Sequence, residues 1–298
     1  MPNLPPSSLV TDLISGVREL FIETLQPSQL LLRILGRFHS FRSFMLKRYS
    51  SRLSTKILVS EPQGSKHFTS TISHKPFLKS LYQDGITDTF SLKQDSLYRL
   101  LDYAYSVRFT SEDNTSSYLG RDIISPTFLP EYPIYRRHSV DSDSPLVRSI
   151  VTDPLILYLA EQYLGLPPIV GNCQLYFSLP NRSSTFKRDQ KRYFSYHYDI
   201  DDYRFLKLFI YLTDVSGMSG PHCYVKTSHL DYSLTKKICR RISQATCDHL
   251  YPDQACSILG SAGTSFMEDT FGFHRGAPPN RPRLILHAEY FSTTLSQQ

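Results

Sequence analysis

The 298-residue sequence has no tryptophan and only five cysteines, none of them in a CxxC pair. Their odd number and irregular spacing argue against a disulfide framework and against a zinc site, and favour a reducing compartment. No apolar run approaches the ~18 residues of a membrane-spanning helix, and residues 4–14 lack the positive start of a secretory signal. We therefore expect a soluble, cytoplasmic protein. The Arg/Ser-rich stretch 31–56 resembles an organelle transit sequence, which leaves an organellar location as the alternative.

The positive charge is concentrated at the front of the chain. Residues 1–80 contain eleven Lys and Arg against four Asp and Glu, whereas the whole chain has a formal net charge of +6. A basic front end can contact nucleic acid or an anionic membrane, but no recognised nucleic-acid motif accompanies it. We predict solvated helix surfaces and no nucleic-acid partner, with contact to a membrane surface as an open alternative.

The patterns along the chain divide it into two parts. In residues 8–49 apolar side chains recur at helical spacing, and Pro27 interrupts the run, which predicts two helices. Residues 50–75 are rich in Ser, Thr and Lys and are typical of a loop or linker. We therefore predict a basic helical amino-terminal extension with its linker (residues 1–75) and a main domain (residues 76–298).

The main domain begins with helices and continues with strands. Helical spacing predicts helices over residues 90–104 and 143–163, the second capped by Asp143 or Ser144 and ended by Gly165. Short β-rich runs follow, separated by turns, at 169–179, 193–199, 205–213, 223–227, 264–268 and 283–291. This order predicts an α+β or mainly β fold, a barrel or sandwich of antiparallel strands buttressed by helices.

A histidine and an aspartate stand two residues apart in the predicted strand 193–199. On a strand, residues i and i+2 face the same side, so His197 and Asp199 point together into the barrel. An imidazole nitrogen and a carboxylate oxygen on one edge can occupy two adjacent positions of a divalent metal. The pair alone is weak evidence, because chance produces this spacing often.

A later segment supplies a third ligand and a cation. His274 follows a predicted strand, and Arg283 begins another nine residues later. Two histidines and one carboxylate bind iron(II) and leave three positions open, enough for a bidentate 2-oxoacid and for dioxygen. The distal carboxylate of 2-oxoglutarate requires a planar, permanently charged partner, which Arg283 offers and a lysine matches less well. These residues predict an iron(II) oxygenase site.

Three stretches, taken in order, carry a family resemblance across about residues 145–292. They are His197-Tyr-Asp199, then Tyr211-Leu-Thr-Asp214 leading to Ser219-Gly-Pro221 and Thr227-Ser-His229, and finally Glu268-Asp-Thr-Phe-Gly-Phe-His274-Arg-Gly with its downstream arginine. The chain resembles the phytanoyl-CoA dioxygenase-like family of iron(II)- and 2-oxoglutarate-dependent oxygenases. The resemblance implies a double-stranded β-helix (a jelly-roll, cupin-like barrel). It also implies the metal ligands His197, Asp199 and His274, and Arg283 as the 2-oxoglutarate anchor.

The chain departs from the family pattern at two points. Many relatives have a serine or threonine two residues after the last metal histidine, where this chain has Gly276, so a second cosubstrate contact is left unassigned. The spacing from that histidine to the arginine is also shorter than in the best-known relatives, and Arg281 competes with Arg283 for the role. Strand phase favours Arg283, because it begins the apolar run.

Several other residues are candidates for the site, and each also has a structural alternative. Lys207 shares a strand face with Phe209 and Tyr211, and if that face points inward it can contact a carboxylate of the cosubstrate or substrate; a solvated outer position is the alternative. Glu268 and Asp269 can orient a ligand imidazole or serve a turn or salt bridge. Structural roles are expected for Cys223, as a small core residue, and for His222, His229 and His287.

We predict a dioxygenase that uses iron(II), 2-oxoglutarate and dioxygen to hydroxylate an unactivated C–H bond of a small metabolite or lipid-like substrate, releasing succinate and carbon dioxide. Related halogenases replace the carboxylate that Asp199 retains, so hydroxylation is favoured over halogenation, while desaturation and cyclisation stay open. One rival keeps the fold but uses another metal and no 2-oxoacid. The other rival is a non-catalytic cupin-like metal-binding module that recruits a partner through the basic front end. The open three-ligand site argues against it. Residues 80–150 and 180–195 are expected to select the substrate.

Overall fold

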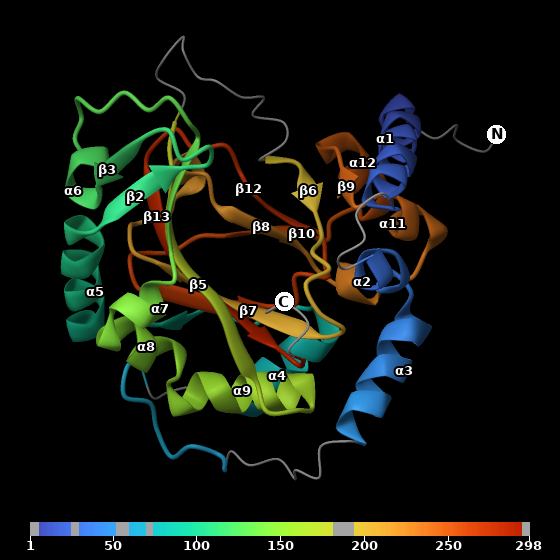
Figure 1. The fold of residues 1–298 in the computed structure, drawn as a ribbon, viewed down its shortest axis with the longest axis horizontal. Coiled ribbons are helices and arrows are strands. Elements are labelled where there is room, and N and C mark those ends of the chain that lie inside the picture. Colours follow the sequence, from blue (N-terminus) through green and yellow to red (C-terminus); the bar gives the residue numbers. More distant parts are fainter. Residues whose placement is uncertain (1–5, 25–29, 52–59, 70–73, 181–193, 294–298) are drawn as a thin grey trace.

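Two antiparallel β-sheets form the body of the protein (Figure 1). The computed structural model describes residues 6–24, 30–51, 60–69, 74–180 and 194–293. In these ranges the larger sheet has the strand order β1-β11-β7-β13-β5-β4-β2-β3, and the smaller sheet has the order β10-β8-β12-β6-β9. The larger sheet comprises β1 (Phe90–Ser91), β2 (Arg108–Ser111), β3 (Ser117–Leu119), β4 (Ile134–His138), β5 (Ile169–Ser178), β7 (Phe205–Tyr211), β11 (Thr264–Glu268) and β13 (Arg283–Phe291). The smaller comprises β6 (Tyr196–His197), β8 (His222–Val225), β9 (Arg241–Ile242), β10 (Ala255–Ile258) and β12 (His274–Gly276).

Helices cover the outer face of the larger sheet. They are α4 (His74–Gln83), α5 (Gln94–Ser106), α6 (Gly120–Ile123), α7 (Val140–Asp143), α8 (Pro145–Val151) and α9 (Pro154–Leu164). Alternate side chains of the central strands, such as Leu175, Leu208 and Leu286, join Leu100 and Leu159 of these helices in one buried apolar cluster. The opposite face of the same strands looks toward the smaller sheet and carries many polar side chains. Because polar groups are costly to bury without a purpose, this inner face is where a site is expected.

The amino-terminal helices pack against the smaller sheet. They are α1 (Ser7–Thr24), α2 (Leu30–Leu35) and α3 (His39–Ser50), and α1 contacts β9, α11 (Leu234–Ile238) and α12 (Gln244–Leu250). Leu32 shares a buried cluster with Cys223 of β8, which confirms the core position predicted for that cysteine. Buried Arg37 donates to the Lys237 carbonyl oxygen at 2.8 Å. The division of the chain into an extension (residues 1–75) and a main domain (residues 76–298) stays a prediction.

Two of the predicted helical regions are divided into shorter helices in the structure. The described parts of the first region, residues 8–24 and 30–49, contain three helices instead of two, because the second run turns at Gly36, where a Cβ would lie 2.2 Å from the Leu32 carbonyl oxygen. The predicted helix 143–163 is two helices: Ser144 caps α8, and Asp153 caps α9 ahead of Pro154. None of the helices in the described part of the chain has the length and apolar character that crossing a bilayer requires.

Buried Asp153 also fixes a segment that precedes α4. One carboxylate oxygen accepts from the Ser65 hydroxyl at 2.8 Å and from the Lys66 and His67 backbone N–H groups at 3.1 Å. The other accepts from the Leu155 N–H at 3.0 Å. The segment that Asp153 holds thus lies against the main domain.

Replacing Asp153 by alanine is expected to lower the free energy of unfolding by about 3 kcal/mol, because a helix cap is lost and several buried donors lose their acceptor. Urea unfolding followed by circular dichroism measures the change. The matched control is Asp95→Ala in the first turn of α5, where the side chain is 82% exposed, and a change within about 0.5 kcal/mol is expected. Equal effects of the two substitutions would show that the Asp153 contacts contribute nothing.

Candidate metal centre

A cavity of about 200 Å³ lies between the inner faces of the two sheets. Its lining includes all five residues singled out in the sequence as site residues: His197, Asp199, Lys207, His274 and Arg283. Few of the described lining side chains are wholly apolar, among them Ile134 and Phe209. The cavity therefore suits a small, polar molecule.

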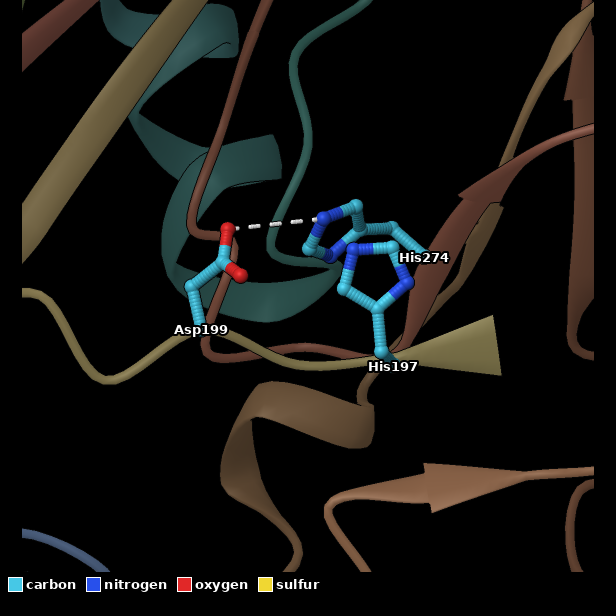
Figure 2. Close-up of side chains that lie close together, drawn as sticks. All are labelled: His197, Asp199 and His274. Carbon is cyan, nitrogen blue, oxygen red and sulfur yellow. Dashed lines mark ion pairs between the residues drawn. The ribbon is translucent and has the colours of Figure 1, made fainter. Parts of the chain in front are cut away.

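His197, Asp199 and His274 come together at one side of this cavity (Figure 2). His197 and His274 are direct cross-strand partners on β6 and β12, and their ring centroids are 4.5 Å apart. Strand β6 ends at His197, and Asp199 lies just beyond it, its N–H donating to the Thr270 carbonyl oxygen at 2.8 Å. The Asp199 Oδ2 lies 3.5 Å from the His274 Nε2. One donor atom from each of the three residues lies within 4.8 Å of the others, which fits a single divalent metal ion.

Backbone carbonyls orient both imidazoles. The Nδ1 of His197 lies 3.1 Å from the Ser195 carbonyl oxygen, and the Nδ1 of His274 lies 3.0 Å from the Gly272 carbonyl oxygen. A carbonyl oxygen only accepts, so each Nδ1 carries the proton and each Nε2 keeps its lone pair for a metal. Burial, with the neighbouring His274, lowers the pKa of His197 to about 3. His197 is thus a neutral imidazole, the form that binds metal.

The sequence left two roles open for Glu268 and Asp269: orienting a ligand imidazole, or serving a turn or salt bridge. In the structure their hydrogen bonds go to residues other than His197 and His274. Both carboxylate oxygens of Glu268 lie 2.9 Å from the His222 Nε2. Asp269 accepts from the Tyr163 hydroxyl at 2.6 Å and from the Phe271 N–H at 2.9 Å. Glu268 therefore positions His222 in the cavity wall, and Asp269 positions the loop that contains Phe271. Neither acid orients the imidazole of His197 or His274.

Lys207 points inward, which is one of the two positions that the sequence left open for it, and its ammonium contacts three carboxylates. Its ammonium lies 2.9 Å from Asp199, 2.7 Å from Asp201 and 3.3 Å from Glu289. Burial opposes the charged form, but the three carboxylates outweigh it and hold the pKa of Lys207 well above its ordinary value. Burial likewise opposes ionisation of Asp199, yet Lys207 and the nearby His274 hold the pKa of Asp199 well below its usual range. The lysine thus keeps the aspartate charged and ready for a cation.

Arg283 lies in the cavity wall, whereas Arg281 is exposed and outside the lining. The Arg283 guanidinium donates to the Gly220 carbonyl oxygen, and its Nη2 donates to the hydroxyl of Ser178, its cross-strand partner, at 3.2 Å. A Cβ at Gly276 would lie 2.9 Å from that same Nη2. The glycine therefore makes room for the guanidinium, and a hydroxyl next to it comes from β5 instead of β12.

Two of the three histidines assigned structural roles line the cavity. The ring centroids of His222 and His287 each lie 4.8 Å from that of Phe209. The structural expectation holds for His229, which is buried outside the lining and lies 3.3 Å from the Tyr82 carbonyl oxygen. Strand phase was the available signal for His287, since it follows Arg283 by four residues and so shares its face.

Comparisons with known proteins address the fold. No family model matches the chain, and no curated protein matches it in sequence. Among solved structures, EctD from S. alaskensis with 2-oxoglutarate and 5-hydroxyectoine is 16% identical; the match covers 80% of this chain and 80% of that chain, with a TM-score of 0.52. The epimerase SnoN in complex with Fe3+, alpha-ketoglutarate and nogalamycin RO is 18% identical, over 74% of this chain and 84% of that chain, with a TM-score of 0.50. The chain therefore has the predicted double-stranded β-helix fold, which it shares with EctD and SnoN.

Proposed function

We propose that this protein is an iron(II)- and 2-oxoglutarate-dependent oxygenase whose metal ligands are His197, Asp199 and His274. The observation that carries the proposal is the convergence of these three donors beside a cavity that also contains a buried arginine, Arg283. Solved proteins of the same fold support it, since EctD was crystallised with 2-oxoglutarate and SnoN with Fe3+ and alpha-ketoglutarate.

Iron(II), 2-oxoglutarate and dioxygen together supply an oxidant that can take hydrogen from an unactivated C–H bond, with succinate and carbon dioxide as coproducts. The residues of the chain bind 2-oxoglutarate and orient the groups around the metal site. Arg283 pairs with the distal carboxylate of 2-oxoglutarate, and the Ser178 hydroxyl beside it offers a second contact. Lys207 holds the Asp199 carboxylate in place; its direct contact with a cosubstrate or substrate carboxylate stays a prediction.

Hydroxylation of a small metabolite is the outcome that we propose. The polar lining favours a small metabolite over a lipid-like substrate. SnoN, with the same fold, is an epimerase, so the fold alone does not select the outcome, which the position of the substrate C–H bond decides.

Anaerobic titration with iron(II) and then 2-oxoglutarate tests the proposal. A visible charge-transfer band is expected when 2-oxoglutarate chelates the bound iron, and admission of oxygen is expected to yield succinate. Absence of both the charge-transfer band and succinate would contradict the proposal. Mass spectrometry of a metabolite extract, with and without 2-oxoglutarate, then identifies the compound that gains one oxygen atom.

Replacing Arg283 by alanine is expected to weaken 2-oxoglutarate binding about 100-fold, because a buried charge-assisted pair contributes about 3 kcal/mol. The exposed Arg281→Ala is the matched control and is expected to change the affinity less than about twofold. The charge-transfer titration measures both. If Arg281→Ala weakened 2-oxoglutarate binding more than Arg283→Ala did, Arg281 would be the residue that binds its distal carboxylate.

A further inference from the structure

Polar side chains form a connected row across the inner face of the larger sheet. Gln174 on β5 and His287 on β13 are direct cross-strand partners. Arg136 on β4 donates from Nη1 to the Gln174 Oε1 at 3.2 Å. The Gln174 Nε2 lies 2.9 Å from the His287 Nδ1. The three residues all line the cavity next to the metal ligands.

This row determines which nitrogen of His287 carries the proton. A guanidinium can only donate, so Gln174 must turn its oxygen toward Arg136 and its NH2 group toward His287. The His287 Nδ1 must then accept, which places the ring proton on Nε2. Burial, assisted by Lys207, lowers the pKa of His287 well below its ordinary value, so the ring is neutral and has this single N–H.

The His287 Nε2 is buried and has no hydrogen-bond partner in the described part of the chain. The Glu289 Oε1 lies 3.9 Å away, beyond hydrogen-bond distance, and is itself 3.3 Å from the Lys207 ammonium. His287 is 5% exposed, and its ring stacks on Phe209 with an interplanar angle of 29°. A buried donor without a partner is costly, typically about 1–3 kcal/mol, so its retention beside a binding cavity indicates a ligand.

We propose that His287 donates a hydrogen bond from Nε2 to an oxygen of the molecule bound in this cavity, and that Arg136 and Gln174 hold it in the donor tautomer. The inference deepens the proposed function and rests on it only in assuming that a small molecule binds beside the metal ligands. The ligand therefore has a carbonyl, carboxylate or hydroxyl oxygen at this point. That oxygen belongs either to 2-oxoglutarate or to the primary substrate.

Nuclear magnetic resonance of protein labelled with 15N-histidine tests the tautomer without any turnover. In metal-free protein, and again with Zn2+ added, His287 is expected to show its proton on Nε2. Gln174→Leu is expected to abolish this preference, whereas His249→Phe, on the exposed face of α12, is expected to leave it unchanged. A proton on Nδ1 in the unaltered protein would overturn the proposal, whether or not the protein binds iron.

His287→Phe, which keeps a stacking ring, then identifies the source of the oxygen. If 2-oxoglutarate supplies it, the 2-oxoglutarate dissociation constant rises about tenfold in the charge-transfer titration. If the primary substrate supplies it, that constant is unchanged. In this case the oxygenated product from a metabolite extract decreases about tenfold, while uncoupled succinate formation persists. A variant equal to the unaltered protein in both measurements would contradict the donor role.

Discussion

Replacing His274 by alanine is expected to weaken iron(II) binding by more than about 100-fold and to abolish succinate formation. Loss of a residue that only orients a metal ligand typically lowers metal affinity by about 10- to 100-fold, and loss of the ligand itself has a larger effect. His274 sits between the other two ligands: it pairs with His197 across the strands and its Nε2 is 3.5 Å from Asp199. Removing it leaves two donors, too few for a facial site.

Iron affinity is measured by anaerobic equilibrium dialysis, and folding by urea unfolding of the metal-free protein. Asp199→Asn is the companion variant, because it keeps the shape of the ligand and removes its charge. The control is His249→Ala on the exposed face of α12. If His274→Ala and His249→Ala bind iron equally well, the metal does not lie between these three residues.

Replacing Lys207 by methionine is expected to lower the free energy of unfolding of the metal-free protein by about 3 kcal/mol. The substitution keeps most of the apolar stem but leaves Asp199, Asp201 and Glu289 without their shared ammonium, and removing one partner from a buried ionic group is strongly destabilising. Added Zn2+ is expected to restore part of this loss and to stabilise the variant more than the unaltered protein, because a cation then replaces the missing charge beside Asp199.

The matched control is Lys226→Met. Its ammonium makes a single ion pair, 3.0 Å from Asp84, and the two side chains are 46% and 36% exposed. An exposed pair of this kind contributes less than about 1 kcal/mol. Urea unfolding with and without Zn2+ compares the two variants. Equal losses would mean that the buried cluster around Lys207 is no more important than a surface ion pair.

Two buried strands, β11 and β13, could be predicted to the residue, β5 and β7 could be predicted to within two residues, and the shortest strands could not. Strands β11 and β13 begin and end where the apolar runs predict, because both of their faces are covered, one by helices and one by the other sheet. Strand β12 has three residues, including Arg275 and Gly276, and therefore has no periodicity. It forms because β6 and β8 lie on either side of it, a non-local condition that a single sequence does not display.

The same division applies to the candidate site. Ligand identity is a property of side chains, so His197, Asp199 and His274 were recognisable before the structure brought them together. Their orientation depends on main-chain oxygens two residues earlier, which any residue type supplies. His222 and His287 line the cavity, a position that the number of metal ligands could not reveal.

Phe271 lies three residues before His274, and the guanidinium carbon of Arg42 lies 3.5 Å from the centroid of its ring. The Lys236 ammonium lies 4.3 Å from the same centroid. Burial and the nearby Arg42 lower the pKa of Lys236 to about 7. Through Arg42, helix α3 therefore packs against the loop whose Gly272 carbonyl orients the His274 ring. Because coupling between two sites is reciprocal, we expect an ion held by His274 to protect α3 from opening, and we expect a chain without α3 to bind that ion less tightly.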